Sequence, residues 1–101
     1  GDWIWAEAKR EQLRMKYSNA MLLLSDGYLK EGSFSKAEVL LRKIYVKDPY
    51  FEDATSLLLR LYLNMNRRND AVKHYREYEK ILSGELGISP SPEIRKIMKE
   101  L

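Results

Sequence analysis

Apolar residues recur along the whole chain at the spacing of an α-helix, three or four positions apart. The first stripe is long, and its members are Leu13, Tyr17, Ala20, Met21, Leu24 and Tyr28. This spacing predicts an amphipathic helix that begins near Trp5 or Ala6 and ends at Glu31. Gly32 is the natural stop, since glycine tolerates the left-handed conformation after a last turn. No segment alternates with period two for long enough to predict a strand.

A second helix follows at once, and its apolar stripe is formed by Phe34, Ala37, Leu41 and Ile44, flanked by Leu40. Either Ser33 or Ser35 is suited to cap its first turn. It is expected to end near Lys47, because Pro49 cannot continue a helix and restrains the residue before it.

Two more helices are predicted in the second half of the chain. The third covers about 50–65 and turns inward Ala54, Leu57, Leu58, Leu61, Tyr62 and Met65. Asn66 then stands where Gly32 stood, and asparagine is the next-best left-handed residue. The fourth helix carries Ala71, Tyr75, Tyr78 and Leu82, and it is expected to end before Gly84 or Gly87.

A short last helix begins with strong start signals. Ser91 is a good N-cap, Pro92 suits the first helical position, and Glu93 places a favourable charge in the first turn. Its single apolar face consists of Ile94, Ile97, Met98 and Leu101. We therefore predict a capping helix over about 91–101.

The helices repeat with a step of 34 residues, which brings Leu24, Tyr28 and Ala37 onto Leu58, Tyr62 and Ala71. This period is that of the tetratricopeptide helix–turn–helix. It predicts an all-α, right-handed superhelical stack of antiparallel helix hairpins, with about five helices in a single domain over 1–101. The repeats would span about 18–51 and 52–85. Leu59 and Ser83 depart from the pattern, so the second repeat is degenerate.

Composition narrows the class of protein. A length of 101 residues suits one domain, and we expect it to be a piece of a longer chain because it begins with Gly1. The net charge of +3 does not by itself indicate nucleic-acid binding. The absence of cysteine excludes disulfides and fits a reducing compartment, so a cytoplasmic location is expected. No apolar run approaches the roughly 20 residues that span a bilayer.

Candidate chemistry is sparse. His74 is the one histidine, and a surface or half-buried position that titrates near neutral pH is favoured over a ligand or base. Zinc needs three or four converging ligands, and no glycine-rich phosphate loop is present. Neither catalysis nor a metal or cofactor is therefore expected. The basic clusters, including Arg67-Arg68, are interleaved with acids; solvated faces are favoured over contacts with DNA phosphates.

Several segments share a narrower resemblance; they are Asp48–Ala54, Leu58, Arg60–Tyr62, Arg67–Ala71, His74-Tyr75 and Leu82 with Glu85–Glu93, together with Trp5, Arg10 and Leu13 in the opening helix. These segments are similar to the bacterial transcriptional activator domain, a family found in regulators of the antibiotic regulatory protein type. Such domains usually follow a winged helix-turn-helix DNA-binding domain. The resemblance implies dimerisation and protein contacts within a transcription regulator.

The resemblance to tetratricopeptide proteins also implies a concave groove lined by the first helix of each repeat. The residues at the groove positions are Asn19, Leu22, Asp26, Leu29, Lys30, Asp53, Ser56, Arg60, Leu63 and Asn64. Their mixture of leucine and charge suits a partner peptide; the alternative is packing against the chain's own last helix. Leu22 and Asp26 replace residues that a carboxylate clamp needs, so a chaperone-binding role is disfavoured.

The aromatic start Trp3-Ile4-Trp5 is the second candidate site, because two tryptophans left in water form an unusual apolar patch. The tryptophans either fold back as a cap or form an interface with an upstream domain or a second copy. The interface is favoured, since a stack has two open ends and only one has an evident capping helix. The predicted function is a non-enzymatic interaction and oligomerisation module of a transcription regulator. The alternative is a stand-alone adaptor that binds a peptide in the groove.

Overall fold

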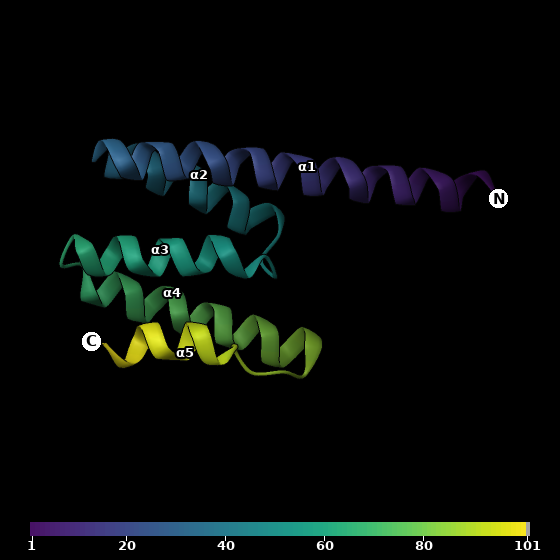
Figure 1. Cartoon of the computed structure of the whole chain (residues 1–101). Helices are drawn as coiled ribbons and strands as arrows, with labels where there is room; N and C mark the ends of the chain where they lie inside the picture. Colours follow the sequence, from purple (N-terminus) through teal and green to yellow (C-terminus); the bar gives the residue numbers. More distant parts are fainter. Residues whose placement is uncertain (101) are drawn as a thin grey trace.

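The computed structural model describes residues 1–100, and these form a stack of helices without a strand (Figure 1). The helices are α1 (Asp2–Glu31), α2 (Phe34–Lys47), α3 (Glu52–Asn64), α4 (Arg68–Ile81), the short π-helix η1 (Leu82–Leu86) and α5 (Pro92–Lys99). The α1/α2 hairpin lies at one end, α3/α4 in the middle and α5 at the other end. The predicted all-α stack is thus confirmed. Leu101, assigned above to the apolar face of the last helix, lies outside the described residues.

The first helix begins earlier than predicted, at Asp2 rather than near Trp5 or Ala6. Residues 2–5 contain no proline or glycine that would interrupt the helix, and Asp2 in the first turn suits the helix dipole. The predicted end at Glu31 is confirmed, because Gly32 has φ 80° and its N–H donates to the Leu29 carbonyl at 3.1 Å. The early start gives α1 a length of 30 residues.

One other boundary differs from prediction. Helix α3 begins at Glu52 rather than Tyr50, because Asp48–Phe51 form a turn in which the Phe51 N–H donates to the Asp48 carbonyl. The fourth helix passes through Gly84 as the π-helix η1 and stops at Gly87, the later of the two predicted ends, where φ is 65°.

Other local predictions are confirmed. Asn66 adopts the left-handed conformation with φ 57° between α3 and α4. The Ser91 hydroxyl accepts from the Ile94 N–H at 3.3 Å, which makes it the N-cap of α5, with Pro92 at the first helical position. These residues set the turns that let successive helices run back against each other.

The core is centred on α3, which contacts α2, α4 and α5. Leu58, Leu59 and Tyr62 are completely buried there. Ala37 of α2 and Ala71 of α4 are also completely buried, and their small side chains let the helices approach closely. Leu59, which departs from the repeat pattern, is therefore a core residue. The repeat boundaries at 18–51 and 52–85 stay a prediction.

The apolar stripe of α1 is not its buried face. Leu13 and Leu24 are 53% and 48% exposed, whereas Ser18 and Ser25 are buried. The helix packs on its serine side, where small side chains allow close contact, and the Ser25 hydroxyl donates to the Met21 carbonyl at 2.8 Å. Met21, Leu22 and Leu29 also pack against the core from this side of the helix. Leu13 and Leu24, at the other edge of the predicted stripe, consequently face away from the stack.

Candidate interaction surfaces

The first part of α1 projects beyond the rest of the molecule (Figure 1). The stack meets α1 at Arg14, whose guanidinium lies 3.6 Å from the Asp48 carboxylate, and at Tyr17, whose ring lies 4.7 Å from Lys47 Nζ. Residues 2–13 are all exposed except the half-buried Ala6. We call this segment the arm. At 1.5 Å per residue it is about 18 Å long.

The tip of the arm carries large apolar side chains on three sides of the helix. Trp3, Ile4 and Trp5 are 71%, 55% and 72% exposed. Successive side chains on a helix are turned by roughly 100°, so the two tryptophans point roughly 200° apart. Because α1 is continuous from Asp2, the aromatic residues do not fold back onto the first helices. The structure therefore does not support an intramolecular cap, and the apolar side chains at the tip are exposed.

The predicted concave groove exists in part. A hollow of about 280 Å³ between α1 and α3 is lined by Leu22, Leu23, Asp26, Asp53, Ser56 and Leu57. Four of these residues were predicted for the groove; Leu23 and Leu57 were not, although Leu23 stands in the apolar run that marks α1. Helix α5 contributes no residue to this hollow. Packing on the last helix therefore does not fill it.

The other predicted groove residues lie elsewhere or stand in water. Asn19 lines a smaller hollow with Met15, Ser18, Asp48 and Phe51. Leu29 and Leu63 are half-buried at the edge of the core. Lys30 is exposed and pairs with the Asp26 carboxylate at 3.0 Å, while Arg60 and Asn64 are simply exposed. The groove thus has an apolar floor and an acidic rim at the α1/α3 end only.

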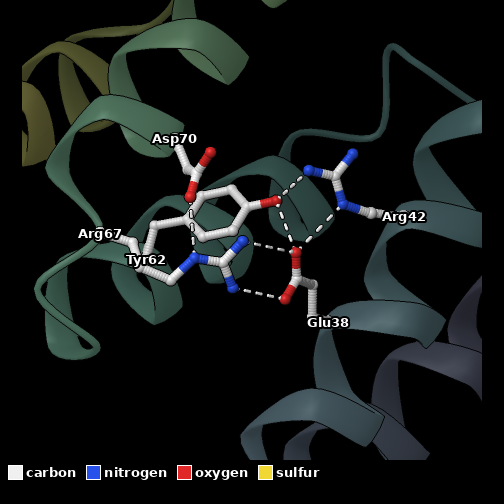
Figure 2. Close-up of polar contacts among 5 residues, drawn as sticks. All are labelled: Glu38, Arg42, Tyr62, Arg67 and Asp70. Atoms are coloured by element: carbon white, nitrogen blue, oxygen red, sulfur yellow. Dashed lines mark hydrogen bonds and ion pairs between the residues drawn. The ribbon is translucent and has the colours of Figure 1, made fainter.

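A polar network joins α2, α3 and the start of α4 (Figure 2). Arg67 donates to both carboxylate oxygens of Glu38, at 2.6 and 3.2 Å, and to Asp70 at 2.8 Å. The Tyr62 hydroxyl donates to Glu38 at 3.0 Å, and Arg42 bonds both Glu38 and Tyr62. Arg67 is therefore paired rather than part of a freely solvated basic cluster, which corrects the expectation for Arg67-Arg68.

These contacts change the ionisation of the network. The bonds from Arg67 lower the pKa of Glu38 below its ordinary value, against the opposing effect of burial. Burial, followed by the bond to Glu38, raises the pKa of Tyr62 to about 12. Both groups thus keep their charge state throughout the neutral range. The network therefore links α2, α3 and the start of α4, and neither Glu38 nor Tyr62 at its centre is an exposed acid or base.

His74 lies in the core rather than at the surface. Its side chain is 4% exposed, the Tyr45 ring stands edge-on at 4.5 Å, and Thr55 Oγ1 lies 3.3 Å from Nε2. Burial, assisted by the Arg42 charge, lowers the pKa of His74 to about 4. The expectation of a surface or half-buried histidine that titrates near neutral pH was wrong, because the fourth helix turns this residue toward α2 and α3.

Residues 1–100 hold no group of three or more histidine, cysteine or acidic side chains placed to bind a metal ion. None of the helices in that range has the length and apolar character needed to cross a membrane.

The helical stack, with its projecting arm and its shallow groove, defines a protein built from stacked helix hairpins. Comparison with known families specifies it further. The family model described as bacterial transcriptional activator domain matches residues 2–101. The chain belongs to this family, which confirms the resemblance drawn from the sequence. No curated protein and no solved structure matches the chain.

Proposed function

We propose that the chain is a non-enzymatic interaction and self-association module of a bacterial transcriptional regulator, working with a DNA-binding domain elsewhere in that regulator. Family membership supports the regulatory role. The observation that carries the interaction role is the arm, whose tryptophans stand in water. Pairing of two modules through this arm would bias the pairing or exposure of the attached DNA-binding domains.

The arm has the features of an interface anchor. Tryptophan is the residue type most enriched among side chains that dominate binding energy. An exposed cluster of large apolar side chains on a monomer marks a contact site for another protein or a membrane. Since Trp3, Ile4 and Trp5 point to different sides of the helix, a partner that covers all three must contact the tip from more than one direction, as in a bundle of helices.

The arm carries its own reporters, because Trp3 and Trp5 are the only tryptophans in the chain. Burial of an indole shifts its emission to shorter wavelength. We expect this shift as the protein concentration rises, together with an increase in sedimentation coefficient. Trp5→Ala should weaken the association measured by sedimentation.

The variant Ile4→Asp keeps both tryptophans but places a charge in the apolar tip. It should hold the chain in the monomeric state with water-exposed emission. Gln12→Asp, at another exposed position of the arm, is the matched control and should leave association unchanged. Equal association of the wild type and Ile4→Asp would show that the arm is not the interface.

The second candidate function is an adaptor that binds a peptide in the concave groove. It is favoured by one observation, the leucine floor with Asp26 and Asp53 on its rim. These carboxylates suit a peptide containing lysine and leucine. Saturable binding of such a peptide that is lost in Asp53→Lys would support the adaptor, whereas binding that Asp53→Lys leaves unchanged would count against the groove.

A further inference from the structure

The outer side of the α1/α2 hairpin carries an apolar face that nothing in residues 1–100 covers. On α1, Leu13 and Leu24 are about half exposed, and Ala20 lies between them. On α2, Val39 and Val46 are 53% and 80% exposed and stand seven residues apart, two turns along one side of the helix. We call this surface the open face; it consists of Leu13, Tyr17, Ala20, Leu24, Val39, Lys43 and Val46.

Contacts across the hairpin show that these residues share one surface. Lys36 Nζ lies 5.7 Å from the Tyr28 ring, and Lys47 Nζ lies 4.7 Å from the Tyr17 ring. The Tyr17 side of α1 is therefore next to the lysine side of α2. A hollow of about 430 Å³, lined by Tyr17, Arg42, Lys43, Val46 and Lys47, runs along this side of the hairpin.

The shape of the open face suits a helix. Two helices running side by side leave a groove that takes the side chains of a third. The molecule uses this arrangement at its other end, where α5 packs on α3 and α4 through the buried Ile94 and Ile97. No helix occupies the corresponding place on the outer side of α1/α2 within the described residues.

Gly27 is a second indication that a helix packs on the open face. It lies inside α1, where glycine is less favourable for helix formation than alanine. A Cβ at Gly27 would meet nothing within 4 Å, and the residue has no left-handed backbone that requires glycine. Gly27 follows Ala20 by seven residues and so lies on the same side of α1. Small residues there would let another helix approach closely.

The charges around the open face indicate which kind of helix would bind there. Lysines surround the open face, and none of them forms an ion pair within residues 1–100; they are Lys9, Lys16, Lys36, Lys43 and Lys47. The carboxylates on the same side of α1, Asp2 and Glu31, are at its two ends. A second copy would bring one lysine-rich face against another, because a two-fold interface pairs identical patches. An acidic partner would bring opposite charges together.

We propose that the open face is the docking site for an acidic amphipathic helix of a partner protein. Leucine-type side chains of that helix would occupy the groove between Leu24 and Val46, and its glutamates or aspartates would pair with the flanking lysines. This inference rests on the proposed interaction role, but it concerns a different surface from the arm. The apolar groove between the lysines favours a helix over a nucleic-acid backbone or a membrane.

The test uses a designed 18-residue helix as the probe, with leucines on one face and glutamates beside them. A second probe carries lysine at every glutamate position. We expect saturable binding of the acidic probe to the whole chain, measured by fluorescence anisotropy, and at least about tenfold weaker binding of the basic probe. Added salt should weaken the acidic complex, since exposed charges are screened.

Adjacent leucines provide a matched pair of variants. Leu24→Glu alters the open face and should weaken acidic-probe binding at least about tenfold. Leu23→Glu makes the same change one residue earlier, in the concave groove, and should leave binding within about twofold. Both residues are exposed, so both variants should keep the wild-type circular dichroism.

Several outcomes would overturn the proposal: no binding of the acidic probe, equal binding of the two probes, or binding that Leu24→Glu leaves intact. Self-association lost in Leu24→Glu would assign the face to a second copy. Binding of duplex DNA or anionic vesicles that is lost in Leu24→Glu, without probe binding, would assign it to those surfaces. Failure of the proposed arm interface would be distinguishable from failure of this docking site, because Ile4→Asp alters self-association and leaves probe binding unchanged.

Discussion

His74 shows how one buried side chain sets the acid sensitivity of the fold. Its imidazole is enclosed by Tyr45 and Thr55, and the charge of Arg42 further disfavours protonation. The neutral form is therefore the one that fits the core. The burial of His74 and the identity of its neighbours could not be predicted from the sequence, since the contacting residues Thr55 and Tyr45 lie 19 and 29 positions away.

The lowered pKa of His74 predicts a loss of stability in mild acid. The unfolded chain binds the proton at a pKa near 6.5 and the folded chain only near 4. Stability should therefore be complete above about pH 6.5 and fall as the pH drops toward 4, by up to about 3 kcal/mol. Urea unfolding at pH 7, 5.5 and 4.5 measures this loss.

His74→Phe is the control for the acid effect, because it removes the titrating group. Its unfolding free energy should be nearly independent of pH between 6.5 and 4.5. The lowered pKa of Glu38 contributes only at lower pH, where that carboxylate begins to be protonated. An unchanged pH dependence in His74→Phe would refute the assignment.

Ala37 marks the point of closest approach within the first hairpin. It is completely buried, so Ala37→Leu forces extra methylene groups into a packed core and should cost about 1–3 kcal/mol. Ala8→Leu makes the same change on the exposed arm and should alter stability by less than about 0.5 kcal/mol. A thermal melt that Ala37→Leu leaves unchanged would contradict the repeat alignment.

At the scale of the helices, the Glu38 network holds three elements together. Glu38 is on α2, Tyr62 on α3, and Arg67 immediately before α4. The arginine–glutamate pair joins residues 29 positions apart in the sequence. The pair fixes the orientation of the second hairpin relative to the first. Apolar packing alone specifies this orientation less closely.

Removal of the Glu38 charge should loosen this arrangement. Glu38→Gln leaves Arg67 without its bidentate partner and should cost about 1–3 kcal/mol, because Glu38 is only partly exposed. Arg67→Gln should cost a similar amount, and the double variant should cost less than the sum of the two. Strict additivity in urea unfolding would show that the pair contributes no coupling.

The helices and their ends were largely predictable, because the signals are local. Apolar spacing, Gly32, Asn66 and the Ser91-Pro92 start depend on residues within a turn or two of each boundary. The packed side of α1 was not predictable. Its stripe of large residues was the stronger pattern, but the fold completely buries Ser18 and Ser25, since contact with α2 decides which side is inward.

At the scale of the whole molecule, the candidate sites were predicted only in part, because they depend on which side of each helix is buried. The apolar tip of the arm was predicted as a candidate site from the two tryptophans that precede the first repeat. The groove was predicted from repeat positions, and four of its ten residues line the observed hollow. The open face was missed, because it exists only where the outer sides of two helices meet and depends on which side of α1 is buried.

We propose that the arm of this transcriptional activator domain is a protein interface, and tryptophan emission across a dilution series is the sharpest test, because both tryptophans lie at the arm tip. Pairing of two arms should give emission at shorter wavelength in concentrated solution and a return to longer wavelength on dilution, whereas Ile4→Asp should show water-exposed emission at every concentration. Water-exposed emission of the wild type at every concentration, with monomeric sedimentation, would show that the arm does not pair.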